Sequence, residues 1–90
     1  MKLICLNTWG GKRLGALIDF IKKSAPTTDI FCFQEVFDST RKETLRSGSI
    51  SNLYKTLQET IPEFRSCFSA SECGHDFDGL PISEDIDWGL

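Results

Sequence analysis

The sequence predicts an α/β fold, and three observations lead to this prediction. Two short apolar runs, residues 3–6 and 30–33, have the length and composition of buried strands. Between them, the apolar residues of segment 14–21 recur with the spacing of one helix face. Later segments continue to alternate between helix-like and strand-like patterns, which is the order typical of α/β domains.

The first half of the chain predicts a strand, a helix and a second strand. Residues 2–6 form a nearly continuous apolar run, and such runs suit a strand that is buried on both faces. Paired glycines then permit a sharp turn into the helix. The helix is expected to stop near Ser24 because Pro26 cannot continue it. The second strand covers residues 30–33 and gives way to polar residues that include Glu35.

The second half predicts a loop, a helix, a strand, a loop and a further strand. Residues 38–49 are polar without a clear period, which indicates a loop. Apolar residues in segment 50–61 repeat with helical spacing up to a proline that ends the stripe. Weak alternation predicts a third strand at residues 64–69. A loop is expected at 70–83 and the start of another strand at 86–90.

The composition fits one small globular domain. The 90 residues are 40% apolar, and seven Phe and two Trp can each bury a large area. Ten basic and 13 acidic residues give a net charge of -3, which provides no electrostatic footprint for non-specific nucleic-acid binding. The apolar start is too short for a signal peptide, and no apolar run is long enough to span a bilayer. We therefore expect a soluble, cytoplasmic protein.

The four cysteines are expected to be reduced thiols in that compartment. Cys5 and Cys32 lie inside the apolar runs, which predicts that both are small core residues. Cys67, Cys73 and His75 leave one alternative open, a small structural zinc domain. Their spacing lacks the close Cys-x2-Cys pair that many zinc sites contain.

Polar side chains follow both strands of the predicted β-α-β unit. Asn7 ends the first strand and Glu35 follows the second. A crossover helix makes the two strands parallel, so their carboxyl ends meet at one edge of the sheet, where ligands of α/β proteins commonly bind. Carboxylate and amide oxygens suit Mg²⁺, and an amide can also donate to phosphate. Glu35 and Asn7 are therefore the candidate metal ligands and the candidate catalytic residues.

The same segments also carry a family likeness. MKLICLNTWGG resembles the opening strand of the endonuclease/exonuclease/phosphatase superfamily, and DIFCFQEV resembles its second strand, which ends in Gln-Glu-Val. The resemblance implies a four-layer α/β/β/α sandwich that hydrolyses phosphodiesters or phosphomonoesters with Mg²⁺ or Mn²⁺. It also implies that Glu35 is the metal-binding glutamate, that Asn7 lies near metal and phosphate, and that Gln34 is structural.

By this resemblance, residues 1–90 correspond to the N-terminal part of such a domain. The family's Asp/Asn pair and its late Ser-Asp-His segment are expected further along, and His75 lies too early to replace that histidine. We therefore expect a partial sandwich that is inactive alone and that self-associates. The substrate stays open among phosphate esters of DNA, RNA, lipid and inositol.

A second hypothesis requires no catalysis. A truncated sheet can pair with another chain through its open edges, so the sequence is also compatible with a non-catalytic interaction module.

Overall fold

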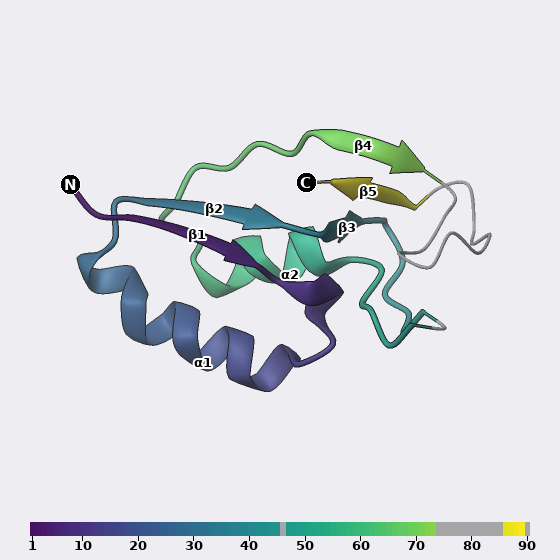
Figure 1. Ribbon diagram of the computed structural model, residues 1–90, viewed down its shortest axis with the longest axis horizontal. Helices are drawn as coiled ribbons and strands as arrows, with labels where there is room; N and C mark the ends of the chain where they lie inside the picture. Colours follow the sequence, from purple (N-terminus) through teal and green to yellow (C-terminus); the bar gives the residue numbers. More distant parts are fainter. Residues whose placement is uncertain (46, 74–85, 90) are drawn as a thin grey trace.

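The computed structural model describes residues 1–45, 47–73 and 86–89 of the chain. They form a small mixed α/β domain with two helices and short strands (Figure 1). The elements, in chain order, are β1 (Leu3–Asn7), the 3-10 turn η1 (Trp9–Gly11), α1 (Leu14–Ser24), the 3-10 turn η2 (Ala25–Thr27), β2 (Ile30–Gln34), β3 (Val36–Asp38), α2 (Leu53–Thr60), β4 (Ala70–Cys73) and β5 (Asp87–Gly89).

β1, α1 and β2 form the predicted β-α-β unit. β1 and β2 pair in parallel, and the register runs from Leu3 opposite Ile30 to Asn7 opposite Gln34. The crossover α1 ends at Ser24, and η2 continues the turn through a proline that cannot extend the α-helix. The parallel pairing and the helix between the strands confirm the sequence-based prediction for this half of the chain.

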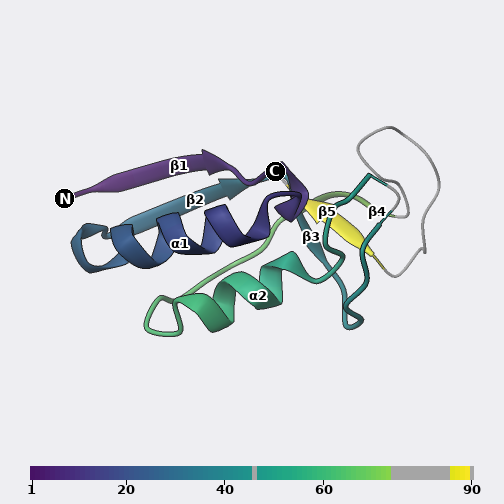
Figure 2. The ribbon, with the colours of Figure 1, turned by 90° about the horizontal axis from the view of Figure 1, so that it is seen from below.

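Among the described residues, the helices cover one face of the β1–β2 sheet and leave the other face open. Both helices lie on the same side of it, as Figure 1 and Figure 2 show from two directions. Exposed and half-buried residues alternate along both strands. Leu3 and Ile30 on the outer face are 54% and 43% exposed.

Two predictions about these strands are therefore wrong for the described structure. The strands are not buried on both faces, and Cys5 and Cys32 are exposed residues of the outer face rather than core residues. The reason is that an unbroken apolar run shows that a strand can be buried, but the number of packed layers decides whether both faces are.

The main hydrophobic core lies between the helices and the inner face of β1–β2. Its buried members are Leu17 and Ile21 of α1, Leu53 and Leu57 of α2, Val36 and Ile61. Leu6, Phe31 and Phe33 of the two strands pack against these residues. The helical stripes that predicted α1 and α2 are thus the faces that each helix buries against the strands.

A second, antiparallel sheet has the strand order β3-β5-β4. β3 begins one residue after Glu35, so the chain passes from one sheet to the other with a single intervening residue. β5 agrees with the strand expected to begin within 86–90, and α2 agrees with the second predicted helix. Residues 74–85 and 90 lie outside the described residues.

The third strand was placed wrongly. Residues 64–69 are not in a strand, whereas Ala70–Cys73, expected as loop, forms β4. The rings of Phe64 and Phe31 meet edge to face at 5.4 Å, and the Phe68 and Tyr54 rings lie 5.1 Å apart. These aromatic contacts hold the segment through its side chains, and a hollow of about 520 Å³ is bounded by the segment, β2 and α2.

The described residues place one layer of helices on one face of β1–β2. The coarse α/β class is therefore established. The described residues do not show the complete four-layer sandwich that the family resemblance implies.

Candidate functional site

Asn7 and Glu35 lie at the same edge of the β1–β2 sheet. Asn7 is opposite Gln34, and Glu35 is the next residue along the chain. The backbone N–H of Thr8 donates to the Gln34 carbonyl at 3.0 Å, and that of Gly10 donates to the Glu35 carbonyl at 3.1 Å. The predicted convergence of the two strand ends is confirmed, and hydrogen bonds join the segments that follow them.

Thr8 is a part of this edge that the sequence analysis did not identify. It is buried, and its hydroxyl lies 2.9 Å from the Gln34 carbonyl and 3.0 Å from the Glu35 carbonyl. A hydroxyl has one hydrogen, so the two carbonyls share a single donor. Thr8 thereby fixes the end of β2 against the end of β1. Its place directly after the strand-ending asparagine was the available signal.

The backbone at this edge adopts left-handed conformations. Trp9 and Glu35 have φ angles of +54° and +59°, which non-glycine residues rarely adopt. Gly11 has φ +80°, and a Cβ there would lie 3.2 Å from side-chain atoms of Ile50 and Leu53. Each left-handed non-glycine residue costs on the order of 1–3 kcal/mol, and such strain is concentrated at functional sites. The strain at Trp9 and Glu35 therefore marks this edge as a candidate site.

The Asn7 side chain is exposed and oriented by the turn that follows it. Its Oδ1 accepts a hydrogen bond of 2.8 Å from the backbone N–H of Trp9. This bond fixes the orientation of the Asn7 amide, with Oδ1 toward the Trp9 N–H. The reversed orientation would bring the Nδ2 group, a donor, against the N–H, which is also a donor. The Nδ2 group can then donate to a phosphate oxygen, while the second lone pair of Oδ1 is still able to face a cation.

The Glu35 carboxylate is half-buried. Within the described part of the chain, no hydrogen bond or ion pair engages it. No group of three or more His, Cys, Asp or Glu side chains is placed to hold a metal among the described residues. One carboxylate and one amide suit Mg²⁺, which usually keeps several waters and uses one or two protein carboxylates together with substrate phosphates. Such a donor set does not suit a closed zinc site.

An aromatic ring and a cation lie next to this pair in sequence. Trp9 is 52% exposed, and Lys12 Nζ is 5.2 Å from the centre of its ring. Stacking of this kind holds the ammonium group over the turn that follows Asn7. The turn thus presents a flat apolar surface and a positive charge beside the strand ends.

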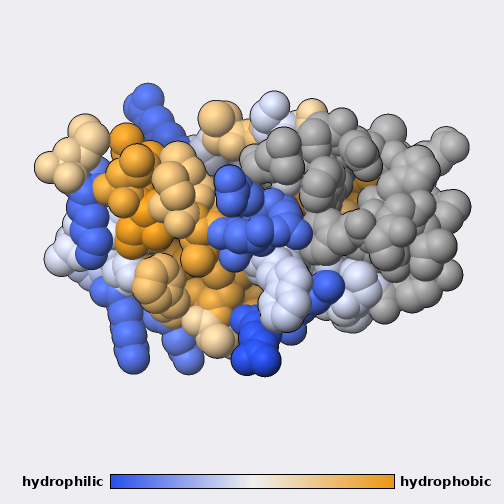
Figure 3. All heavy atoms as spheres, viewed as in Figure 1, coloured by the Kyte–Doolittle hydropathy of each residue, from blue (hydrophilic) through white to orange (hydrophobic). Residues whose placement is uncertain are grey.

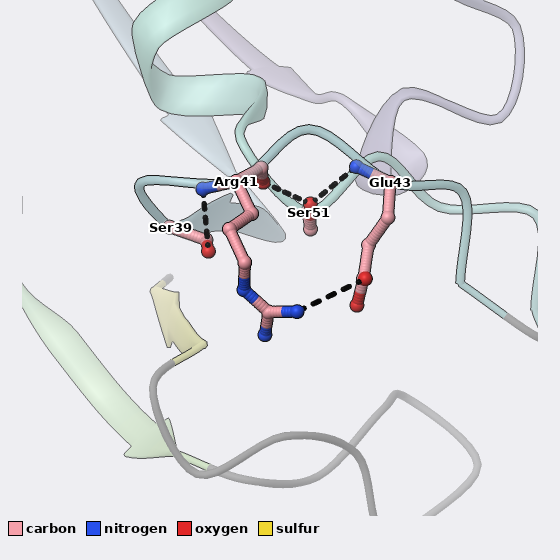
Figure 4. Close-up of polar contacts among 4 residues, drawn as sticks. All are labelled: Ser39, Arg41, Glu43 and Ser51. Carbon is pink, nitrogen blue, oxygen red and sulfur yellow. Dashed lines mark hydrogen bonds and ion pairs between the residues drawn. The ribbon is translucent and has the colours of Figure 1, made fainter.

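The loop between β3 and α2 packs against the same turn. The Ile50 N–H donates to the Gly10 carbonyl at 2.8 Å. Ser51 is fully buried, and its hydroxyl donates to the Arg41 carbonyl at 2.6 Å and accepts from the Glu43 N–H at 2.8 Å (Figure 4). An ion pair of 3.4 Å joins the Arg41 guanidinium to the Glu43 carboxylate. These part-buried hydrogen bonds therefore join residues 41 and 43 to residue 51 at the base of this loop.

Of the other residues singled out by the sequence, Gln34 also lies at this edge. Gln34 is exposed, in the register position opposite Asn7. Cys67 is exposed on the segment before β4. His75 and the Cys73 side chain lie outside what the structure describes, so the zinc hypothesis stays an untested alternative.

The fold and the edge define a mixed α/β domain with polar side chains at the carboxyl ends of two adjacent parallel strands. Searches against protein-family models, curated proteins and solved structures find no match to the chain. Neither described helix is long and apolar enough to cross a membrane.

Proposed function

We propose that the chain belongs to a metal-dependent phosphoric ester hydrolase of the endonuclease/exonuclease/phosphatase type. In this proposal Glu35 is a ligand of Mg²⁺ or Mn²⁺, and Asn7 binds the ion or the substrate phosphate. The observation that supports it best is the parallel register that sets Asn7 opposite Gln34, directly before Glu35. The proposal includes the four-layer sandwich, of which residues 1–90 would be the N-terminal part.

The proposed roles follow from the chemistry of the two side chains. A bound divalent cation would supply polarisation of the phosphoryl oxygen and neutralisation of developing negative charge. Glu35 provides the anionic oxygen that such a cation needs. Asn7, oriented by its bond to the Trp9 N–H, offers an amide donor to a phosphate oxygen. The hydrogen bonds of Thr8 and Gly10 keep the two strand ends at a fixed separation.

Asn7 and Glu35 account for the binding of the metal ion and the phosphate, but not for proton transfer. An amide cannot accept a proton at neutral pH, and a carboxylate that holds the cation is committed to that role. We therefore propose that the general base lies elsewhere in a longer protein and that residues 1–90 are inactive alone. The ester remains open among nucleic-acid, lipid and inositol phosphates, and a cytoplasmic location is part of the same proposal.

Metal binding tests the site on the chain as it stands. We expect Mn²⁺ to broaden the amide resonances of the turn after Asn7 and of Glu35 in a titration followed by NMR. Glu35→Gln should weaken this binding about tenfold or more, because a neutral amide replaces the anionic ligand. Asp19→Asn removes an exposed carboxylate on α1 and is the matched charge control.

The same substitution tests the activity in a longer protein. If residues 1–90 are extended by their downstream coding sequence, we expect metal-dependent hydrolysis of a generic phosphodiester. The Glu35→Gln change should remove this hydrolysis, and Asp19→Asn should leave it intact. Unchanged Mn²⁺ binding and unchanged hydrolysis in the Glu35→Gln protein would refute the assignment.

A second candidate function follows from the uncovered sheet face. Leu3, Cys5, Ile30 and Cys32 are exposed on the outer face of β1–β2. Apolar residues gather over this part of the molecule in the view of Figure 3. Exposed apolar patches of this kind mark association sites. A non-catalytic interaction module, which uses this face or the adjoining strand edges, is therefore the alternative to the hydrolase.

A further inference from the structure

Cys5 and Cys32 occupy equivalent positions at the centre of the β1–β2 pair. They are direct partners in the parallel register, with Leu3 opposite Ile30 before them and Asn7 opposite Gln34 after them. Both are exposed, and both belong to the face of the sheet that the helices do not cover. Because partnered residues of adjacent strands point to the same face, the two thiols lie side by side.

The separation of adjacent strands suits a covalent link between these residues. Neighbouring strands lie about 4.7–4.9 Å apart, whereas the Cα atoms of disulfide-bonded cysteines lie about 4.4–6.8 Å apart. Desolvation, followed by charge repulsion and the hydrogen bond from Cys5, raises the pKa of the Cys32 thiol. The register therefore sets the two cysteines at a separation that a disulfide can span.

We propose that Cys5 and Cys32 form a reversible thiol–disulfide pair that links β1 to β2. The oxidant is a low-molecular-weight disulfide of the glutathione class. One cysteine thiolate attacks a sulfur of that disulfide, which forms a mixed disulfide and releases one small thiolate. The second cysteine thiolate then attacks the protein sulfur of the mixed disulfide and releases the other. Two electrons pass from the protein to the small disulfide, which becomes two thiols.

The link would fix the spacing of the two strands close to the proposed site. Cys5 is separated from Asn7 by one residue and Cys32 from Glu35 by two. A bond at this position ties the strands that carry those residues and closes the β1-α1-β2 unit into a loop. The proposal does not require that the chain is a hydrolase, since it rests only on the register and the exposed face.

Redox titration with peptide mapping tests the link in the whole chain. The reduced protein is equilibrated in glutathione buffers of increasing disulfide content, its free thiols are blocked with N-ethylmaleimide, and it is digested with trypsin. Cleavage after Lys and Arg places Cys5 in the peptide 3–12 and Cys32 in the peptide 24–41. We expect these two peptides to be joined, with the loss of two hydrogen atoms, as the main oxidised product.

Matched cysteine variants give the control. Cys5→Ser and Cys32→Ser should each remove the joined peptides, while Cys67→Ser, which removes another exposed thiol, should leave them. The oxidised wild-type protein should also unfold at a higher urea concentration than its reduced form, and Cys5→Ser should lose this shift.

If the cysteines were oxidised at random, the ratio of the disulfide pairs would differ from the ratio expected for the folded chain. In an unfolded chain, loop-closure statistics favour the Cys5–Cys32 pair over Cys32–Cys67 by no more than about a factor of two. In the folded protein, the ratio of the Cys5–Cys32 to the Cys32–Cys67 disulfide should be well above this factor of about two. The same oxidation in urea should return the ratio to the value for an unfolded chain. Equal pair ratios in native buffer and in urea, or two freely blocked thiols throughout the titration, would overturn the proposal.

Discussion

Glu35 combines a strained backbone with a half-buried carboxylate. Its φ of +59° places it in the left-handed region, and its carbonyl accepts hydrogen bonds from the Gly10 N–H and from the Thr8 hydroxyl. These bonds hold the residue in a conformation that a glutamate otherwise disfavours. At the scale of single residues, the backbone conformation of Glu35 therefore lowers the stability of the fold, and the residue holds a charged side chain between β2 and β3.

The strain predicts an unusual order of stability between two variants. Glu35→Ala removes the carboxylate and keeps the strain, whereas Glu35→Gly removes both. We expect Glu35→Gly to be about 1 kcal/mol more stable than Glu35→Ala in urea unfolding, because left-handed backbone costs an L-residue roughly 1–2 kcal/mol and glycine almost nothing.

Helix α2 provides the matched control for this comparison. Glu59 is an exposed residue of α2, and there glycine should be less stable than alanine by about 1 kcal/mol. The same order at both positions, with alanine the more stable variant, would show that the backbone at Glu35 is not strained.

At the scale of elements, the β3–β5 pair carries like charges in register. Asp38 and Asp87 are direct partners across the two antiparallel strands. Desolvation, followed by the charge of Asp87, raises the pKa of Asp38 above its ordinary value of 3.8. Like charges that face each other across strands destabilise the pairing. Asp38 therefore makes this short sheet sensitive to pH.

The sign of this dependence follows from the raised pKa. The folded chain holds the Asp38 proton more readily than the unfolded chain, so folding is favoured when pH falls below the ordinary aspartate value. Stability is lost as pH rises from that value through the raised pKa of the folded state. Asp38→Asn should therefore stabilise the protein at neutral pH by roughly 0.2–1 kcal/mol, and the gain should vanish at acid pH.

Urea unfolding at neutral and acid pH measures this difference. Asp19→Asn, which neutralises an exposed carboxylate on α1, should show no comparable stabilisation at neutral pH. A gain from Asp38→Asn that is equal at both pH values would contradict the role of charge.

At the scale of the whole molecule, the described chain has an uneven distribution of apolar surface. The inner face of β1–β2 is covered by α1 and α2, and the outer face leaves Leu3 and Ile30 about half exposed. Surfaces of this kind favour association, because contact removes apolar area from water. The partial-sandwich hypothesis requires a partner for this face, and the interaction-module hypothesis can use the face or the adjoining strand edges.

If the chain associates through the outer face of β1–β2, charged residues placed on this face should reduce the association. We expect the chain to sediment as a concentration-dependent oligomer, and Leu3→Lys with Ile30→Lys to shift it toward the monomer, since lysines oppose burial of the outer face. Phe20→Lys changes an apolar residue of α1 that is 45% exposed and serves as the control. A monomer at all concentrations, or an equal effect of Phe20→Lys, would contradict this role of the outer face.

Sequence reasoning predicted part of the arrangement at the strand ends. It located Asn7 and Glu35 at one edge, because a β-α-β crossover fixes the direction of both strands. It did not identify Thr8 or the left-handed backbone at Glu35, since both depend on contacts between segments far apart in the sequence. The metal role and the family assignment remain predictions.

The sequence by itself determined α1, α2 and the parallel direction of β1 and β2. Helical spacing and proline positions are local properties that each segment carries in its own residues. Only the tertiary structure decided that Cys5 and Cys32 face outward, that β4 lies at Ala70–Cys73, and that residues 64–69 pack without strand pairing. The physical reason is that burial of a strand face and partnership in a sheet depend on which other segments come to lie against it.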